Sequence, residues 1–219
     1  MCRHTRLVTY FFIFISSLST PAHAEKFASI IIDDLGNNFA HGKAIIDLPA
    51  ALTIAILPKT TYAKDLARLA AKNNKEVMLH LPMQSVEHHK PSPGTLDLHM
   101  TRNEFNKQLI LNLNSVPYVR GVNNHMGSLL TRHPGHMSWL MEELSRYGGL
   151  YFIDSRTTSK SIAEKIADEY KIPNLARDYF LDPDDEESTM RQQFKFFIQK
   201  SNNNYHFDKI KICILFFYN

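Results

Sequence analysis

The sequence predicts an α/β domain of parallel strands joined by crossover helices, and three observations support this. From Lys26 onward, short apolar runs alternate with segments of helical period, which is the pattern of βα units. The first run, Ile30-Ile31-Ile32, is apolar on both faces, as a strand buried under helices should be. The unit recurs about every 25 to 40 residues. With 44% hydrophobic and 21% charged residues in 219, one globular domain with a real core is expected.

Five apolar runs are expected to form strands. They are short and bounded by polar, Gly or Pro residues, as buried strands are. In chain order they cover 29–32, 53–57, 77–79, 118–122 and 150–153.

The segments between these runs carry helical signatures. Leu66, Leu69 and Ala70 lie on one stripe of residues 62–73. Thr101 and Glu104 fit a capping box, which predicts a helix start at that point. A later helix is expected to end before Gly148-Gly149, and two more are expected at 161–170 and 185–200.

Residues 1–24 are expected to be a cleavable signal peptide. Arg3 and Arg6 form a basic start, an apolar stretch follows, and Ala22-His23-Ala24 is a small-x-small cleavage pattern. The mature chain would then start at Glu25 in the periplasm or outside the cell. The apolar stretch is shorter than the roughly 20 residues of a membrane-spanning helix, so no stable span is expected after cleavage. An uncleaved anchor is the alternative.

The remaining chain divides into a domain at 25–200 and an atypical tail at 201–219. The tail ends in an apolar segment, Ile210 to Tyr218, without a turn or a helix cap. It is expected either to form a last strand or to mark a truncated or frameshifted end.

The charge balance excludes one class of partner. The formal net charge is +3, from 25 Lys and Arg against 22 Asp and Glu. Without Arg3 and Arg6, 23 basic residues face 22 acidic ones. Nucleic-acid binding needs clustered Lys and Arg, so a nucleic-acid partner is not expected.

Polar side chains follow four consecutive strands at the point where each is expected to end. These groups are Asp33-Asp34, His80, Asn123-Asn124-His125 and Asp154-Ser155. The carboxyl ends of parallel strands share one face, where active sites are built. Carboxylates and imidazoles gathered there are the ligand set of a catalytic divalent metal.

Each of these residues also has a simpler interpretation. Asp154 alone could be a helix N-cap, Asp33 and Asp34 could shape a turn with Gly36, and His80 could be a hydrogen-bonded core residue. Taken together, the residues favour a metal site. Because adjacent side chains point to different sides of a strand end, one Asp could bind metal while the other faces substrate.

Four motifs together resemble the divergent polysaccharide deacetylase family. They are Ile30 to Gly36 (IIIDDLG), Leu79 to Met83 (LHLPM), Gly121 to Ser128 (GVNNHMGS) and Tyr151 to Ser155 (YFIDS). The resemblance runs from about Ala28 to Lys200. It implies a deformed (β/α) barrel with a metal-dependent hydrolytic site that acts on N-acetylated polysaccharides or oligosaccharides.

The resemblance also implies roles for individual residues. Asp34, His80 and His125 would hold a divalent metal, for which zinc is the expected ion. Asp33 would be the general base, and Asp154 would be a second catalytic residue that orients the base or the substrate. Residues implied to bind substrate are Asn124, Ser128 and Ser155. No oligomeric state is predicted.

Two departures from the family pattern favour an alternative function. His80 is not part of an H-x-x-x-H pair, and residues 201–219 contain His206 but no Gly-His-Pro motif that would supply a general acid. The barrel is therefore expected to be incomplete at its C-terminus. The alternative is a catalytically inactive periplasmic protein that binds glycans or another envelope component.

Overall fold

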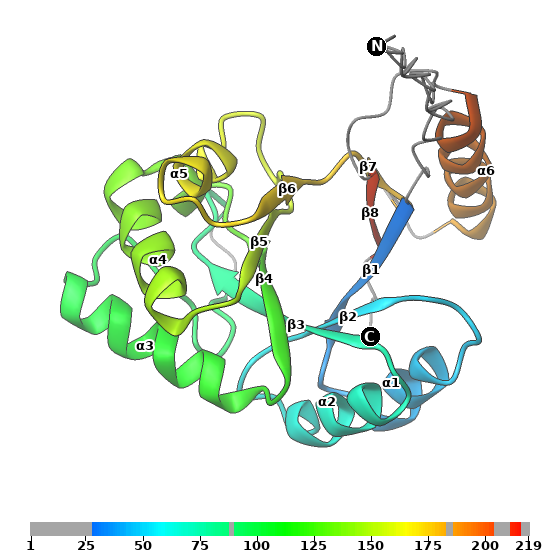
Figure 1. Cartoon of the computed structure of the whole chain (residues 1–219), viewed down its shortest axis with the longest axis horizontal. Coiled ribbons are helices and arrows are strands. Elements are labelled where there is room, and N and C mark those ends of the chain that lie inside the picture. Colours follow the sequence, from blue (N-terminus) through cyan, green and yellow to red (C-terminus); the bar gives the residue numbers. More distant parts are fainter. Residues whose placement is uncertain (1–27, 88–89, 183–185, 204–210, 216–219) are drawn as a thin grey trace, which may run out of the picture.

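The computed structural model describes residues 28–87, 90–182, 186–203 and 211–215. In these residues, eight strands form one sheet in which every paired neighbour is parallel (Figure 1). The strands are β1 (Ala28–Leu35), β2 (Thr53–Ile56), β3 (Glu76–Met83), β4 (Val119–Met126), β5 (Tyr151–Asp154), β6 (Asn174–Ala176), β7 (Tyr179–Phe180) and β8 (Lys211–Leu215).

The order of the strands shows that the sheet curls into a barrel. Across the sheet they run β6-β5-β4-β3-β2-β1-β8-β7, so β6 and β7 are its two edges. Yet β6 ends at Ala176 and β7 begins at Tyr179. Even a fully extended chain between these two residues spans at most about 11 Å. The two edges must therefore lie close together. No pairing joins them among the described residues, so the barrel is open along this seam, and the expected deformed (β/α) barrel is confirmed.

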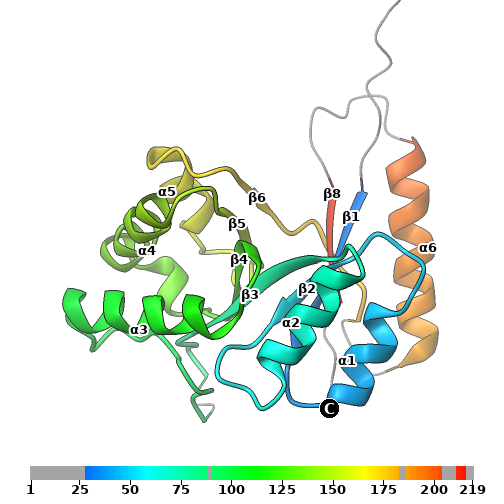
Figure 2. The same ribbon diagram turned by 60° about the horizontal axis from the view of Figure 1, so that its bottom comes forward.

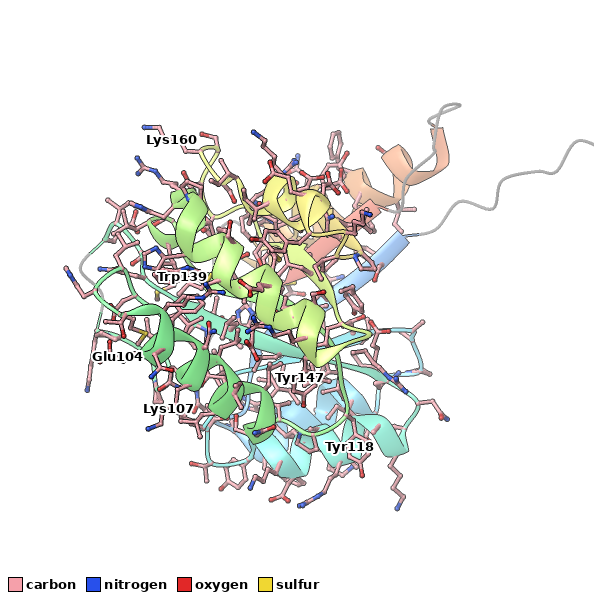
Figure 3. The ribbon with its side chains drawn as sticks, turned by 60° about the vertical axis from the view of Figure 1, so that its left-hand side comes forward. Glu104, Lys107, Tyr118, Trp139, Tyr147 and Lys160 are labelled. Carbon is pink, nitrogen blue, oxygen red and sulfur yellow. The ribbon has the colours of Figure 1, made fainter. Side chains whose placement is uncertain are left out.

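Helices cover the outside of the barrel. Figure 2 shows α1 and α2 side by side next to β2, and Figure 3 shows α3 and α4 side by side, with Trp139 on α4 and Glu104 on α3. The helices are α1 (Phe39–Ile46), α2 (Ala63–Lys72), α3 (Arg102–Ser115), α4 (Pro134–Tyr147), α5 (Ala163–Glu169) and α6 (Glu187–Asn203), with a short 3-10 turn, η1, at Leu130–Arg132.

Local sequence sets several helix ends as expected. Thr101 and Glu104 form the capping box at the start of α3. Gly148 has a φ of 79° and ends α4. A further helix, α1, begins after Asn38, whose side chain accepts a hydrogen bond from His41 N at 3.1 Å.

The side chains of each strand alternate between two cores. Outward-facing residues such as Ile54, Leu79 and Phe152 join the large core under the helices. Their neighbours along the strands face the barrel interior and form a small second core, which consists of Ile31, Ala55, Met78 and Ile153. The two-residue period of a strand therefore decides which side chains reach the interior.

Four strands extend beyond their expected ends. β1 continues to Leu35, β3 to Met83, β4 to Met126 and β5 to Asp154. The polar residues expected directly after these strands therefore lie inside them, apart from Ser155. Pro82 is tolerated in β3 because the pairing with β2 stops at Leu79, so no ladder hydrogen bond is lost there.

The tail at 201–219 was expected either to form a last strand or to mark a truncated or frameshifted end, and part of it forms a strand. Lys211–Leu215 form a strand, β8, which pairs in parallel with β1. The expected signal peptide at 1–24 and His206 lie outside the described residues. Among the described residues, no helix is long and apolar enough to cross a membrane.

Candidate metal centre

The barrel interior changes from apolar to polar toward the carboxyl ends of the strands. Asp33 and His80 lie two residues beyond Ile31 and Met78 of the inner core, so they face the same interior. Asn123 occupies the equivalent position on β4, directly paired with His80 in the β3–β4 register. All three polar residues are fully buried. The inner face of the barrel thus places them together at the carboxyl ends of the strands.

Asp34 joins this group through an unusual backbone conformation. By strand alternation its side chain should point away from the interior, since that of Asp33 points inward. Asp34 instead has a φ of 63°, in the left-handed region. This conformation is uncommon for a residue other than Gly, although Asp adopts it more readily than most residues do. It brings the carboxylate of Asp34 to His80 and His125.

Three donor atoms from Asp34, His80 and His125 converge. Asp34 Oδ1 lies 2.9 Å from His125 Nδ1 and 3.2 Å from His80 Nε2. The two histidine nitrogens lie 3.2 Å apart. Ligands at 2.0–2.2 Å from a tetrahedral ion are separated by about 3.3–3.6 Å, so the triangle is close to the size that a zinc-like ion requires.

The surroundings of Asp34 also fit a cation. Its Oδ1 atom is buried but forms no well-oriented hydrogen bond, and two ring nitrogens face the same point. One carboxylate and two imidazoles suit zinc, and they also suit other first-row divalent metals. Asp34, His80 and His125 could therefore hold a divalent metal.

Burial and charge shift the pKa values of these groups in opposite directions. Burial alone would raise the pKa of Asp34, but the contacts with His125 and His80 lower it below its ordinary value. Burial alone would lower the pKa of His80, but the carboxylates of Asp33 and Asp34 raise it to about 9. The negative charge of this pocket thus attracts a proton or a metal cation to His80.

Asp33 lies on the other side of the same imidazole ring. Its Oδ1 is 3.6 Å from His80 Nδ1 and accepts a hydrogen bond of 2.8 Å from Asn123 Nδ2. Its second oxygen, Oδ2, is buried and has no hydrogen-bond partner. Burial raises the pKa of Asp33 to about 6, although His80 and Asn123 oppose this shift. The pKa of Asp33 therefore lies closer to neutral pH than that of an ordinary carboxylate.

Access from solvent is on the side of His125 and Asp34. Their side chains are 14% and 19% exposed, whereas that of His80 is completely buried. His125 also lines a cavity of about 450 Å³, which extends under the loop after β3 past Glu87, Ser92 and Asp97.

The other predicted site residues brace the strand ends. Asp154 is buried and accepts hydrogen bonds from Ser161 Oγ at 2.7 Å and Arg156 N at 2.8 Å. Ile153 faces the inner core, so alternation directs Asp154 to the opposite face. Burial raises the pKa of Asp154. Its carboxylate thus stabilises its own loop, and its catalytic role stays a prediction.

Asn124, Ser155 and Ser128 also make contacts within the protein. Asn124 Oδ1 accepts from Ser155 N at 2.8 Å, which links the ends of β4 and β5. Ser155 Oγ is buried and has no hydrogen-bond partner. Ser128 Oγ accepts from Val86 N and donates to Glu87 Oε2, both at 2.9 Å. Ser128 therefore holds the loop that forms the cavity wall, and substrate binding by the three residues stays a prediction.

Sequence reasoning did not assign a role to Asn123. It stands within the motif Gly121 to Ser128, but an Asn at a strand end is common and carries no signal of its own. Its position in the register opposite His80 and its contact with Asp33 emerge only from the fold.

The sequence and the fold both match known proteins. A model of the family described as "Divergent polysaccharide deacetylase" matches residues 30–207. An uncharacterized protein of Haemophilus influenzae is 36% identical over 189 residues, which cover 86% of this chain and 67% of the relative. The uncharacterized protein YibQ of Escherichia coli is 34% identical over 188 residues, with 86% of this chain and 58% of YibQ covered. This chain therefore spans about three fifths to two thirds of the length of these relatives.

Two solved structures share the fold. An uncharacterized protein of Agrobacterium tumefaciens has a TM-score of 0.80 at 19% identity, covering 89% of this chain and 78% of that one. A lactam utilization protein of Thermus thermophilus has a TM-score of 0.59 at 11% identity, covering 87% of this chain and 89% of that one. At these identities the likeness shows the architecture alone.

Proposed function

The chain belongs to the divergent polysaccharide deacetylase family, and on this premise we propose that it is a metal-dependent carbohydrate N-deacetylase. Its substrates would be N-acetylated glycans of the cell envelope. The observation that carries the proposal is the convergence of Asp34, His80 and His125 beside the buried carboxylate of Asp33. Residues 1–24, as an export signal, would place this activity in the periplasm or outside the cell.

The three donor atoms and Asp33 would have different roles in amide hydrolysis. Asp34, His80 and His125 would hold a divalent cation, which supplies Lewis-acid polarisation of a carbonyl oxygen and a lowered pKa of water. Asp33 is not part of the triangle of donor atoms. It contacts the opposite nitrogen of the His80 ring, so it remains available for proton transfer.

Asp33 has the properties of a general base. The pKa of about 6 keeps it ionised at neutral pH but makes it a stronger base than an ordinary carboxylate. Its Oδ2 would accept a proton from water as the water oxygen bonds to the acetamide carbon. When the C–N bond breaks, the same proton can pass to the leaving nitrogen, which gives acetate and a free amine.

The cavity beside His125 suits a sugar substrate. Its volume of about 450 Å³ lies within the range of small-molecule sites, about 300 to 1,000 Å³. Polar side chains line much of it, including Glu87, Gln108 and Asp97. Hydroxyl and amide groups of a glycan could form hydrogen bonds with such a wall.

Acetate release from N-acetylated oligosaccharides tests the proposal directly. The purified protein, supplied with Zn²⁺, should release acetate, and a chelator should stop the release. The Asp33→Asn variant is the matched control for contaminating activity. Glycan binding without acetate release, in a protein that holds metal, would contradict the deacetylase and support the inactive glycan-binding alternative.

A further inference from the structure

The side chain of Asn123 connects the expected base to a buried metal-ligating ring. Asn123 Nδ2 donates to Asp33 Oδ1, and Asn123 Oδ1 lies 2.8 Å from His80 Nδ1. Asp33 is on β1, whereas His80 and Asn123 are on β3 and β4, so the amide reaches across the barrel interior. All three side chains are fully buried, so bulk solvent does not compete for these two contacts.

The chemistry of an amide fixes the proton on His80. A carboxylate only accepts hydrogen bonds, so the end of Asn123 that faces Asp33 must be its NH₂ group. The other end is then the carbonyl oxygen, which can only accept. His80 Nδ1 must therefore carry a hydrogen and donate it to Asn123.

This hydrogen determines what the far side of the ring can do. In a neutral imidazole with a proton on Nδ1, Nε2 has a free lone pair. Nε2 is the atom that lies 3.2 Å from both Asp34 Oδ1 and His125 Nδ1. With the opposite tautomer, a hydrogen on Nε2 would occupy the place where the three donor atoms meet.

We propose that Asn123 is a positioning residue that fixes His80 as the tautomer able to bind a metal through Nε2 and at the same time holds Asp33 in place. A partner on the second nitrogen of a metal-bound histidine is common, and its loss typically weakens metal binding by about 10–100-fold. The proposal rests on the proposed function for the bound metal and for the role of Asp33 as base. The tautomer of His80 follows from the contacts of Asn123 alone.

Two substitutions separate the two contacts of Asn123. Asn123→Leu has nearly the same size and removes both hydrogen bonds. Asn123→Asp keeps an acceptor for His80 Nδ1 but places a second carboxylate against Asp33. Asn112 provides the matched control, because it is also fully buried and its amide bonds Gly94 O and Gln108 Nε2, both at 2.8 Å, away from the metal centre.

The test reads the tautomer by NMR and the metal affinity by competition. Long-range ¹H–¹⁵N spectra of the full chain would be recorded with Zn²⁺ bound and, without metal, at pH 10, with the His80 signals assigned from a His80→Gln variant. Zn²⁺ affinity would be measured against a chelating dye. The wild-type protein and Asn112→Leu should show His80 protonated on Nδ1 and equal Zn²⁺ affinities.

The variants have distinct expected results. Asn123→Leu should mix the two tautomers and weaken Zn²⁺ binding by about 10–100-fold. Asn123→Asp should keep the Nδ1–H tautomer and the Zn²⁺ affinity, but it should lose acetate release because two adjacent carboxylates share one proton. Failure of the wild-type protein to release acetate would count against the proposed function and would leave the tautomer result standing.

Two results would overturn the proposal. One is a wild-type His80 that carries its hydrogen on Nε2. The other is a folded Asn123→Leu protein with a single Nδ1–H tautomer and unchanged Zn²⁺ affinity. If Asn123→Leu does not fold, the wild-type spectrum and the Asn123→Asp variant decide the question.

Discussion

Asp34 Oδ1 lies 2.9 Å from His125 Nδ1, although Asp34 is on β1 and His125 is on β4. β2 and β3 separate these strands in the sheet. At about 4.8 Å per strand, a flat sheet would hold β1 and β4 about 14 Å apart. The curvature of the barrel, together with the left-handed backbone of Asp34, therefore creates the site.

The two adjacent aspartates are predicted to have separable roles. Loss of a residue that hydrogen-bonds a metal ligand typically weakens metal binding by about 10–100-fold. Asp34→Asn changes a ligand itself, so it should weaken metal binding by at least about 100-fold. Asp33→Asn should retain the metal and lower acetate release by about 10²–10⁴-fold, because a proton acceptor is lost. Metal affinity and initial rates on the same preparations would check this. Full metal and full activity in both variants would exclude the assignment.

Metal affinity is predicted to rise with pH. His80 has a pKa raised from 6.5 to about 9, so metal must displace a proton from it below pH 9. The apparent affinity should rise by up to tenfold per pH unit in this range and then level off. In the metal-free protein, the stability contributed by His80 is complete below pH 6.5 and is lost as the pH rises through about 9.

Chelator competition between pH 6 and 10, corrected for protonation of the chelator, would measure this dependence. Urea unfolding of the metal-free protein over the same range would measure the stability. A metal affinity that stays constant between pH 7 and 9 would show that no proton is displaced from His80.

Asp154 is predicted to act on the stability of its loop and not on metal binding. Asp154→Ala removes the acceptors for Ser161 Oγ and Arg156 N and should cost about 1–3 kcal/mol of unfolding free energy. Asp154→Asn keeps an acceptor and should cost less. Urea unfolding and metal titration would test both variants. A large loss of metal affinity in a folded Asp154→Asn protein would instead place Asp154 in the metal centre.

Gly121 is predicted to be required because a side chain at this position would collide with the ring of Tyr151. A Cβ at position 121 would lie 2.4 Å from the Tyr151 ring, and the hydroxyl of this ring is bonded to Glu76. Gly121→Ala should therefore destabilise the protein by about 1–3 kcal/mol. Gly135→Ala is the control, since a Cβ there meets nothing within 4 Å. Equal unfolding midpoints for the two variants would contradict the packing described.

Much of the fold could be predicted because its signals are local. Apolar runs marked β1 to β5, and the capping box at Thr101 and the glycine at Gly148 marked helix ends. β6 and β7 were missed because they have three and two residues and are only half buried. Strands of this length are too short to show the two-residue alternation of a strand in the sequence.

The candidate site was predictable in its members but not in its geometry. The sequence indicated that Asp34, His80 and His125 would meet, because polar residues at parallel strand ends share one face. It could not show the positive φ of Asp34, which depends on the surrounding structure. Nor could it show that Asp154, the last residue of β5, faces away from the three donor atoms. The roles of Asn123 and Asn124 depend on register, which only the folded sheet defines.

Metal content per chain shows whether Asp34, His80 and His125 hold a divalent cation. The protein would be incubated with Zn²⁺, dialysed and analysed for metal, beside His125→Ala and with circular dichroism to show that both are folded. We expect about one zinc per wild-type chain, as for a catalytic site with three protein ligands, and little in the variant. A folded wild-type protein without metal, or equal metal in both proteins, would contradict this expectation.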